Sequence, residues 1–210
     1  MKTFQDRTVK ILSNRNVVGI VLIVIGLLVL AFFGLRAVRS FRTLQYIREQ
    51  GLDRGTASVE AIRPWMTVRY VSVAYGVPQE YIFAELDIPF DRRSSNDTVG
   101  HLNRVYQLGR SERGDYPAIT DDIAAAILAY QANPVATGLD DIRPWMTIRY
   151  IANSTGVPET YLLEQLGLGA ENNNVYKPLD ELAGSVRYDG GPRALVRDLG
   201  RVLRQYEEAP

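Results

Sequence analysis

The chain contains one stretch of sequence twice. Residues 59–86 read VEAIRPWMTVRYVSVAYGVPQEYIFAEL, and residues 139–166 read LDDIRPWMTIRYIANSTGVPETYLLEQL. Aligned without gaps at an offset of 80, the two copies are identical at 13 of 28 positions. Because an internal repeat fixes the number of structural units, we expect the later part of the chain to form two units, residues 59–135 and 136–210.

An apolar run near the N-terminus predicts a membrane anchor. Residues 17–35, VVGIVLIVIGLLVLAFFGL, contain neither a charge nor a proline. At about 1.5 Å of rise per residue, a helix of this length matches the hydrocarbon thickness of a bilayer. A cleaved signal peptide would have a shorter apolar region and a cleavage site of small residues, whereas Arg36, Arg39 and Arg42 follow here. We therefore expect a single-pass transmembrane helix after an N-terminal tail of residues 1–16.

A basic segment of residues 36–58 follows the apolar run. Residues 36–50 lack glycine and proline, so the helix should continue to Gly51, with a short linker after it. The arginines of this helix would lie among anionic lipid headgroups, which makes the bilayer an expected partner. Both flanks of the span are basic, so charge does not orient it. A short tail before an anchor usually leaves the later residues outside the cytoplasm, and we expect that location in the cell membrane.

Each copy of the motif predicts two helices joined by a tight turn. In the first copy, Thr67 is a good N-cap for a helix over residues 68–75, because its hydroxyl can accept from a backbone N–H one turn later. Gly76 should end that helix in the left-handed conformation, and Pro78 should start a second helix over residues 79–86. The same signals recur in the second copy at Thr147, Gly156 and Pro158.

Further helices complete each unit. The expected segments are 100–108 and 178–186, followed by the longer segments 121–132 and 192–209, with Thr120 as the cap of 121–132. No stretch alternates with a period of two between hairpin signals. The predicted fold is all-α: one N-terminal transmembrane helix, then two tandem four-helix repeat units with a helix-turn-helix-like core.

The two-helix element resembles a helix-turn-helix, as found in DNA-binding regulators. Residues 151–162, IANSTGVPETYL, and residues 71–82, VSVAYGVPQEYI, match its apolar positions and its glycine turn. The resemblance implies DNA binding, but the second helices contain no Arg or Lys and carry two glutamates each. Residues 56–135 and 136–210 each have a net charge of −3, which opposes phosphate binding. Nucleic acid is therefore not the expected partner.

The same residues also resemble the start of a lysin-motif (LysM) domain. The fit covers TVRYVSVAYGV, residues 67–77, and TIRYIANSTGV, residues 147–157. This resemblance implies glycan binding outside the cell.

Composition gives little support to catalysis. Cysteine is absent, and His101, the only histidine, is expected to be a polar residue at the start of a helix. No glycine-rich phosphate loop, HExxH or GxSxG motif occurs. We expect no catalytic residue, no metal site and no cofactor.

A set of repeated arginines and tyrosines has no evident folding role. The candidate partner-binding residues are Arg63, Arg69, Tyr70, Arg143, Arg149 and Tyr150. A repeated arginine can also clamp a carboxylate of its own repeat or stack on a tryptophan. Trp65 and Trp145 share one repeat position and are expected to fill core slots between helices.

Together these features predict a non-enzymatic, membrane-anchored scaffold that presents a duplicated helical surface to a protein partner. Two tethered weak sites would gain from effective concentration. The alternatives are extracytoplasmic glycan binding and a membrane-tethered DNA-binding regulator. The oligomeric state is open.

Overall fold

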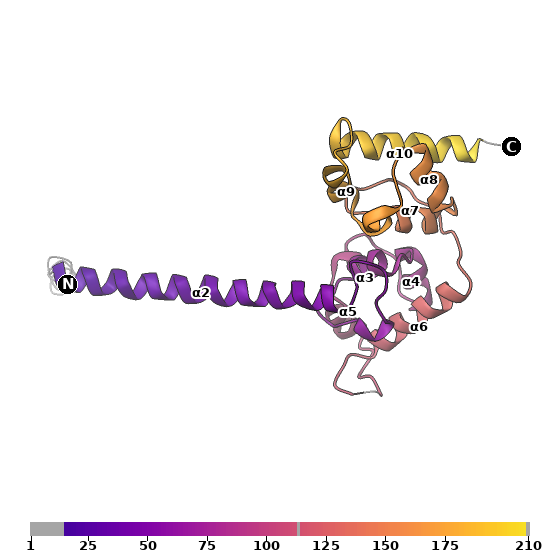
Figure 1. Ribbon diagram of the computed structural model, residues 1–210. Helices are drawn as coiled ribbons and strands as arrows, with labels where there is room; N and C mark the ends of the chain where they lie inside the picture. The colour runs from indigo at the N-terminus through magenta and orange to yellow at the C-terminus, as the bar shows by residue number, and fades with distance from the viewer. Residues whose placement is uncertain (1–14, 113, 209–210) are drawn as a thin grey trace, which may run out of the picture. The chain divides into compact units, whose positions relative to one another are not determined.

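The computed structural model describes residues 15–112 and 114–208 of the chain. The chain divides into two compact units, one that ends at Glu49 and one that begins at Gln50. The described residues form nine α-helices and no strand, which confirms the expected all-α class (Figure 1). The predicted N-terminal tail, residues 1–16, lies outside the described residues except for its last two.

The first unit is one long helix, α2 (Arg15–Glu49). The apolar run and the basic segment form a single uninterrupted helix, as expected, and the chain turns at Gly51, where φ is +69°. Its large apolar side chains from Ile20 to Leu35 are exposed. By length and composition, the part Gly19–Glu49 can cross a membrane.

The second unit contains two successive groups of helices. The first group follows a short 3₁₀ turn, Val59–Ala61, and consists of α3 (Val68–Tyr75), α4 (Gln79–Glu85), α5 (Val99–Val105) and α6 (Ile119–Ala132). The second group consists of α7 (Ile148–Thr155), α8 (Glu159–Gln165), α9 (Leu179–Ser185) and α10 (Gly191–Glu207). Figure 1 shows the first group in purple to pink and the second in orange to yellow.

The helix ends of the doubled motif have the expected chemistry. The Thr67 hydroxyl accepts from the N–H of Tyr70 at 3.1 Å, and Thr147 caps α7 in the same way. Gly76 and Gly156 follow the helices with φ of +65° and +76°, a conformation that favours glycine. These signals were therefore read correctly from the sequence.

The four later helices differ from their predicted bounds by one to three residues at one or both ends. α5 ends at Val105 rather than 108, because Gln107 takes a left-handed conformation and the chain leaves the helix there. The prediction that Thr120 caps α6 is wrong. Ala118 is the cap residue, and the Thr120 hydroxyl donates to the carbonyl of Pro117, where the turn into the helix begins.

Each group buries its own apolar side chains. Those of the first group include Val68, Val71, Ile82, Phe83, Val99, Leu102, Ile119, Ile123 and Ile127. Those of the second group include Ile148, Ile151, Leu162, Leu179, Leu182, Leu195 and Leu199. Val73 of α3 packs against this second cluster, so the two groups share an apolar contact.

The segment before each motif helix is tied to the third helix of its own group. The N–H of Val99 donates to the carbonyl of Met66 at 2.8 Å, and the N–H of Leu179 donates to that of Met146 at 2.9 Å. Each group has a second such hydrogen bond. The carbonyl of Pro64 accepts from the N–H of Gly100 at the start of α5, and the carbonyl of Pro144 accepts from the N–H of Asp180 at the start of α9. The Pro-Trp-Met-Thr segment is thus held in place by its backbone, because its carbonyls satisfy N–H groups at a helix start.

Candidate functional site

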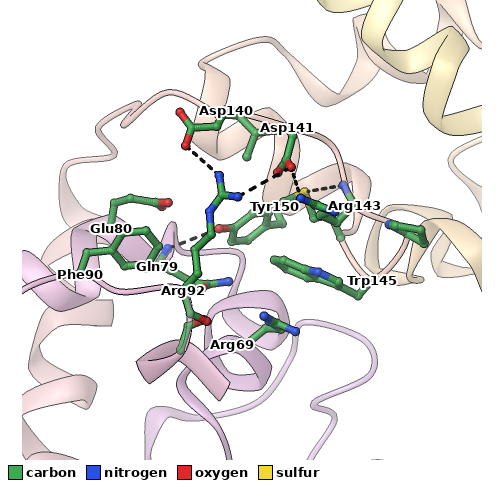
Figure 2. A pocket seen from close by; sticks show the side chains of 14 residues that line it. Arg69, Gln79, Glu80, Phe90, Arg92, Asp140, Asp141, Arg143, Trp145 and Tyr150 are labelled. Carbon is green, nitrogen blue, oxygen red and sulfur yellow. Dashed lines mark hydrogen bonds and ion pairs between the residues drawn. The ribbon is translucent and has the colours of Figure 1, made fainter. Parts of the chain in front are cut away.

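A cavity of about 410 Å³ lies between the two copies of the motif (Figure 2). Helices α3, α4 and α7 and two connecting segments, before α5 and before α7, contribute its walls. The charged lining residues are Arg69, Glu80, Arg92, Asp140, Asp141 and Arg143. The other lining residues used below are Gln79, Phe90, Leu139, Pro144, Trp145 and Tyr150.

Arg69 extends from the first turn of α3 to the second copy. Its Cζ lies 4.8 Å from the centroid of the Trp145 indole, within the range of a cation–π contact. The Nε atom is buried and has no hydrogen-bond partner among the described residues. The Arg69 side chain is half-buried.

Glu80 lies in the first turn of α4 and is also half-buried. Its Oε2 atom is buried without a hydrogen-bond partner in the described part of the chain. Figure 2 accordingly shows no hydrogen bond or ion pair between Glu80 and another lining side chain. In both Arg69 and Glu80 one polar atom is buried, while each side chain borders the cavity, where it can bind a polar group.

Tyr150 closes the floor of the cavity and is only 1 % exposed. Its hydroxyl oxygen lies 3.5 Å from the N–H of Gln79, a long hydrogen bond between the copies. Burial, with the Glu80 carboxylate as the second cause, raises the pKa of Tyr150 to about 12. The structure therefore places the predicted partner-binding residue Tyr150 at the inner wall of the cavity, with its ring packed inside the second copy. Its counterpart Tyr70 is half-buried, with its ring 6.4 Å from that of Trp65.

Arg149 is held within its own copy. Its Nε donates to Glu159 Oε1 at 2.8 Å, and its Cζ lies 4.6 Å from the centroid of the Tyr176 ring. The first copy has Gln79 where the second has Glu159, so the clamp that holds Arg149 is missing for Arg69. The missing carboxylate is one of the differences between the surroundings of the two arginines.

Arg63 and Arg143 lie on the segments before the motif helices. Arg63 donates to the carbonyl of Ile62 at 3.0 Å, and its Cζ lies 5.4 Å from the centroid of the Tyr116 ring. Arg143 forms an ion pair with Asp141 at the rim of the cavity. Of the six predicted residues, the structure brings Arg69, Arg143 and Tyr150 together at the cavity and places the other three elsewhere.

The expectation that both tryptophans fill core slots is wrong for Trp65, which is 45 % exposed. Trp145 is half-buried and packs against the core of the second group, with Arg69 on its ring. The next residue of each copy, Met66 or Met146, takes the core position instead. The N–H of each methionine donates to the carbonyl of Arg63 or Arg143 at 3.0 Å, so the chain makes a tight turn at the tryptophan in both copies.

Several cavity residues were not singled out from the sequence. Arg92 lies in the connection between α4 and α5, and its Nη2 lies 3.0 Å from Asp140 Oδ2. Phe90 in the same connection is 41 % exposed. These residues lie outside the doubled motif or at positions where the copies differ, and such positions carry no repeat signal. The difference between Gln79 and Glu159 at matching positions of the repeat is a sequence signal that the two arginines differ in their contacts.

The structure also bears on metal binding. Within residues 15–112 and 114–208, no three His, Cys, Asp or Glu side chains gather into a group that could hold a metal ion. The carboxylates of the cavity rim are engaged by arginines instead, as the ion pairs of Asp140 and Asp141 show.

Comparison with known proteins gives no relative. No family model, no curated protein and no solved structure matches the chain. The cavity and the apolar helix are therefore the two features on which a proposal can rest.

Proposed function

We propose that this chain is a membrane-anchored interaction protein without enzymatic activity, whose second unit holds a protein partner. The observation that carries the proposal is the cavity between the two motif copies. Arg69 and Glu80 line it, and neither makes a hydrogen bond or ion pair with another described residue. Charged side chains in a partly enclosed site are stabilised by binding a polar group, which a partner can supply.

The proposed architecture is two tandem four-helix units, each built around a helix-turn-helix-like core. Matching contacts support it: both copies cap their first helix with threonine and turn at a left-handed glycine. Both also tie the Pro-Trp-Met-Thr segment to the third helix by two backbone hydrogen bonds. Domain boundaries near residues 58 and 135 follow from this proposal.

The anchor in this proposal is the apolar part of α2. Its length and its run of exposed apolar side chains support membrane insertion, and the arginines that follow suit anionic headgroups. We place residues 59–210 outside the cytoplasm. Protease added to intact cells should then digest these residues, while the chain should resist extraction from membranes by alkaline carbonate. Protection from protease in intact cells would reverse the orientation.

The structure favours one binding place over two equivalent ones. In the second copy, Tyr150 is buried and Arg149 is clamped by Glu159, so this copy does not offer the surface that the motif suggested. The scaffold role therefore rests on the cavity formed jointly by both copies. Avidity from two tethered sites is not part of this proposal.

A role as a membrane-tethered DNA regulator has less support. In a helix-turn-helix the start of the second helix enters the DNA groove. Here that start, Gln79, is buried and its N–H faces Tyr150 of the second copy. The helix also carries Glu80 and Glu85 and no cation, which opposes contact with phosphate.

The proposal can be tested by photo-crosslinking in the cells that produce the chain. A photoreactive phenylalanine analogue at Phe90 is exposed at the cavity and should form an adduct with a polypeptide. The same analogue at Leu128, an exposed position on α6 away from the cavity, is the matched control. The adduct from Phe90 should be lost when Arg69→Ala is added. An absence of polypeptide adducts from Phe90, or identical adducts from both positions, would contradict the proposal.

A further inference from the structure

The cavity presents one type of donor and one type of acceptor that are not in use. The Arg69 guanidinium can only donate hydrogen bonds, and the Glu80 carboxylate can only accept them. Each has one buried atom without a partner in the described part of the chain, and the rest of each group borders the cavity. A ligand that satisfies both must therefore carry both an acceptor and a donor.

The remaining charges of the cavity are already paired. Arg92 lies 3.0 Å from Asp140 and 4.0 Å from Asp141, and Arg143 also pairs with Asp141. The three arginines and three carboxylates of the lining balance in charge. A cavity with no net charge does not select a phosphate or a polycation, and it suits a ligand that is locally neutral.

An apolar wall lies beside these two groups. Phe90, Leu139 and Pro144 line the cavity, and Phe90 is 41 % exposed. At about 410 Å³ the cavity is in the size range of sites that bind small ligands or short segments, roughly 300–1,000 Å³. Such a wall accepts a nonpolar side chain beside the polar contact.

The aromatic geometry argues against a sugar ring as the ligand. Sugars bind proteins by laying their C–H face on an open aromatic face. The Trp145 indole already carries the Arg69 guanidinium at 4.8 Å, and the Tyr150 ring lies 5.7 Å from it. The largest aromatic group of the lining, the Trp145 indole, is therefore already in contact with two side chains of the chain itself.

We propose that the cavity binds an extended peptide segment of the partner through its main chain, with a carbonyl oxygen on Arg69 and an N–H on Glu80. Every peptide group offers an acceptor and a donor and is neutral, as the lining requires. A nonpolar side chain of the segment rests on Phe90. The proposal rests on the proposed function, because it names what the partner places in that site.

The test uses the full chain reconstituted in lipid nanodiscs. A random heptapeptide library displayed on phage is selected on the wild-type chain after depletion on the Arg69→Ala chain. The best sequence is synthesised with free and with singly N-methylated peptide bonds, and its affinity is measured by fluorescence anisotropy. Methylation of one particular N–H should weaken binding roughly ten- to a hundredfold, as expected for a lost hydrogen bond to a charged group.

Variants connect that effect to Glu80. In Glu80→Ala the penalty of the same N-methylation should disappear, while the control Glu85→Ala on the same helix should retain it. Arg104→Ala, an exposed arginine on α5, is the control for Arg69→Ala and should bind like the wild type. Thermal unfolding of each variant shows that loss of binding is not loss of folding, and affinity should change little with salt.

Other outcomes overturn the inference. It fails if no peptide prefers the wild type over Arg69→Ala, if N-methylation has no effect, or if a charged side chain of the peptide carries the affinity. It also fails if peptidoglycan fragments bind the nanodiscs in a manner that needs Glu80. In each case a polypeptide adduct from Phe90 would leave the proposed function standing, whereas the absence of that adduct removes both.

Discussion

Arg69 and Arg149 occupy the same position in two copies of one motif, yet their side chains contact different parts of the molecule. Arg69 reaches across to Trp145 of the other copy, whereas Arg149 pairs with Glu159 of its own. The two tyrosines that follow differ as well, because Tyr150 is buried between the copies and Tyr70 is half-buried. Identical residues thus acquire different roles according to what packs against them.

The difference arises because the copies meet through unlike surfaces. Asn153 of α7 donates to the carbonyl of Gly76 at 2.5 Å, and Val73 of α3 packs on the second core. The first copy therefore contributes α3 and the start of α4, and the second contributes α7 and the segment before it. The repeated residues determine where the helices begin and end in both copies. The asymmetric contact between the copies determines what surrounds the side chains of the matching arginines and tyrosines.

The largest effect is expected at the buried tyrosine. Tyr150→Ala removes a fully packed ring and should lower the free energy of unfolding by about 3–5 kcal/mol. Tyr70→Ala removes a half-buried ring and should cost about 1–2 kcal/mol. Urea unfolding of the full chain in detergent, followed by tryptophan fluorescence, measures both. Equal losses would mean that the copies are packed alike, against the asymmetry described above.

The two turn glycines provide the second comparison. An alanine Cβ at position 76 would lie 2.7 Å from Arg149 Cγ, whereas at position 156 its nearest neighbour is Ala136 at 3.4 Å. Both positions have positive φ, so Gly156→Ala should cost roughly 1–2 kcal/mol from backbone strain alone. Gly76→Ala adds the clash and should cost roughly 2–4 kcal/mol. The same urea experiment measures both losses of unfolding free energy. If Gly76→Ala lowers it no more than Gly156→Ala does, the two copies do not touch at Gly76.

Alkaline pH should reveal the buried hydroxyl. In the folded chain the pKa of Tyr150 is raised to about 12 by burial and by Glu80, and in the unfolded chain it is near the ordinary tyrosine value of about 10. The folded state holds the proton more tightly, so stability is complete below pH 10 and falls as pH rises from 10 to 12. The loss should reach roughly 2–3 kcal/mol.

Tyr150→Phe isolates this contribution from those of the other tyrosines. It should remove that part of the pH dependence, while Tyr70→Phe should leave it in place. The quantity compared is the difference in unfolding free energy between pH 9 and pH 12. An unchanged pH dependence in Tyr150→Phe would contradict the assignment.

The smallest effect concerns the arginine clamps. A double-mutant cycle of Arg149→Ala and Glu159→Gln should give a coupling of about 0.5–1 kcal/mol, since both side chains are partly exposed, 35 % and 26 %. The equivalent cycle of Arg69→Ala and Gln79→Ala should give a coupling near zero. A comparable coupling in the first copy would mean that Arg69 is also held within its own repeat.

The helix ends of this molecule could be predicted from the sequence because they depend on local chemistry. Thr67 and Thr147 cap their helices, and Gly76 and Gly156 end them, through bonds that span at most five residues. The predicted start of α6 was wrong for a local reason too. Thr120 was expected to cap the helix, but its hydroxyl donates to the carbonyl of Pro117, because the turn into the helix begins there.

The cavity could be predicted only in part. Arg69 was identified because it is repeated, but its stacking on Trp145 depends on how the copies pack, which no local pattern encodes. Tyr150 carried the same repeat signal as Tyr70, and only tertiary packing separates them. Glu80 and Phe90 are not repeated in the second copy, so the repeat gave no reason to select them. They belong to the site only because the fold brings them to the cavity.

The contact of Arg69 with Trp145 joins unlike surfaces of two similar groups of helices, so it is a head-to-tail contact and not a two-fold symmetric one. A residue and its counterpart in such an arrangement need not have the same neighbours, and the same substitution can be mild in one group and harmful in the other. Arg149 pairs with Glu159 of its own group, whereas the matching position of the first group is Gln79, which offers Arg69 no carboxylate.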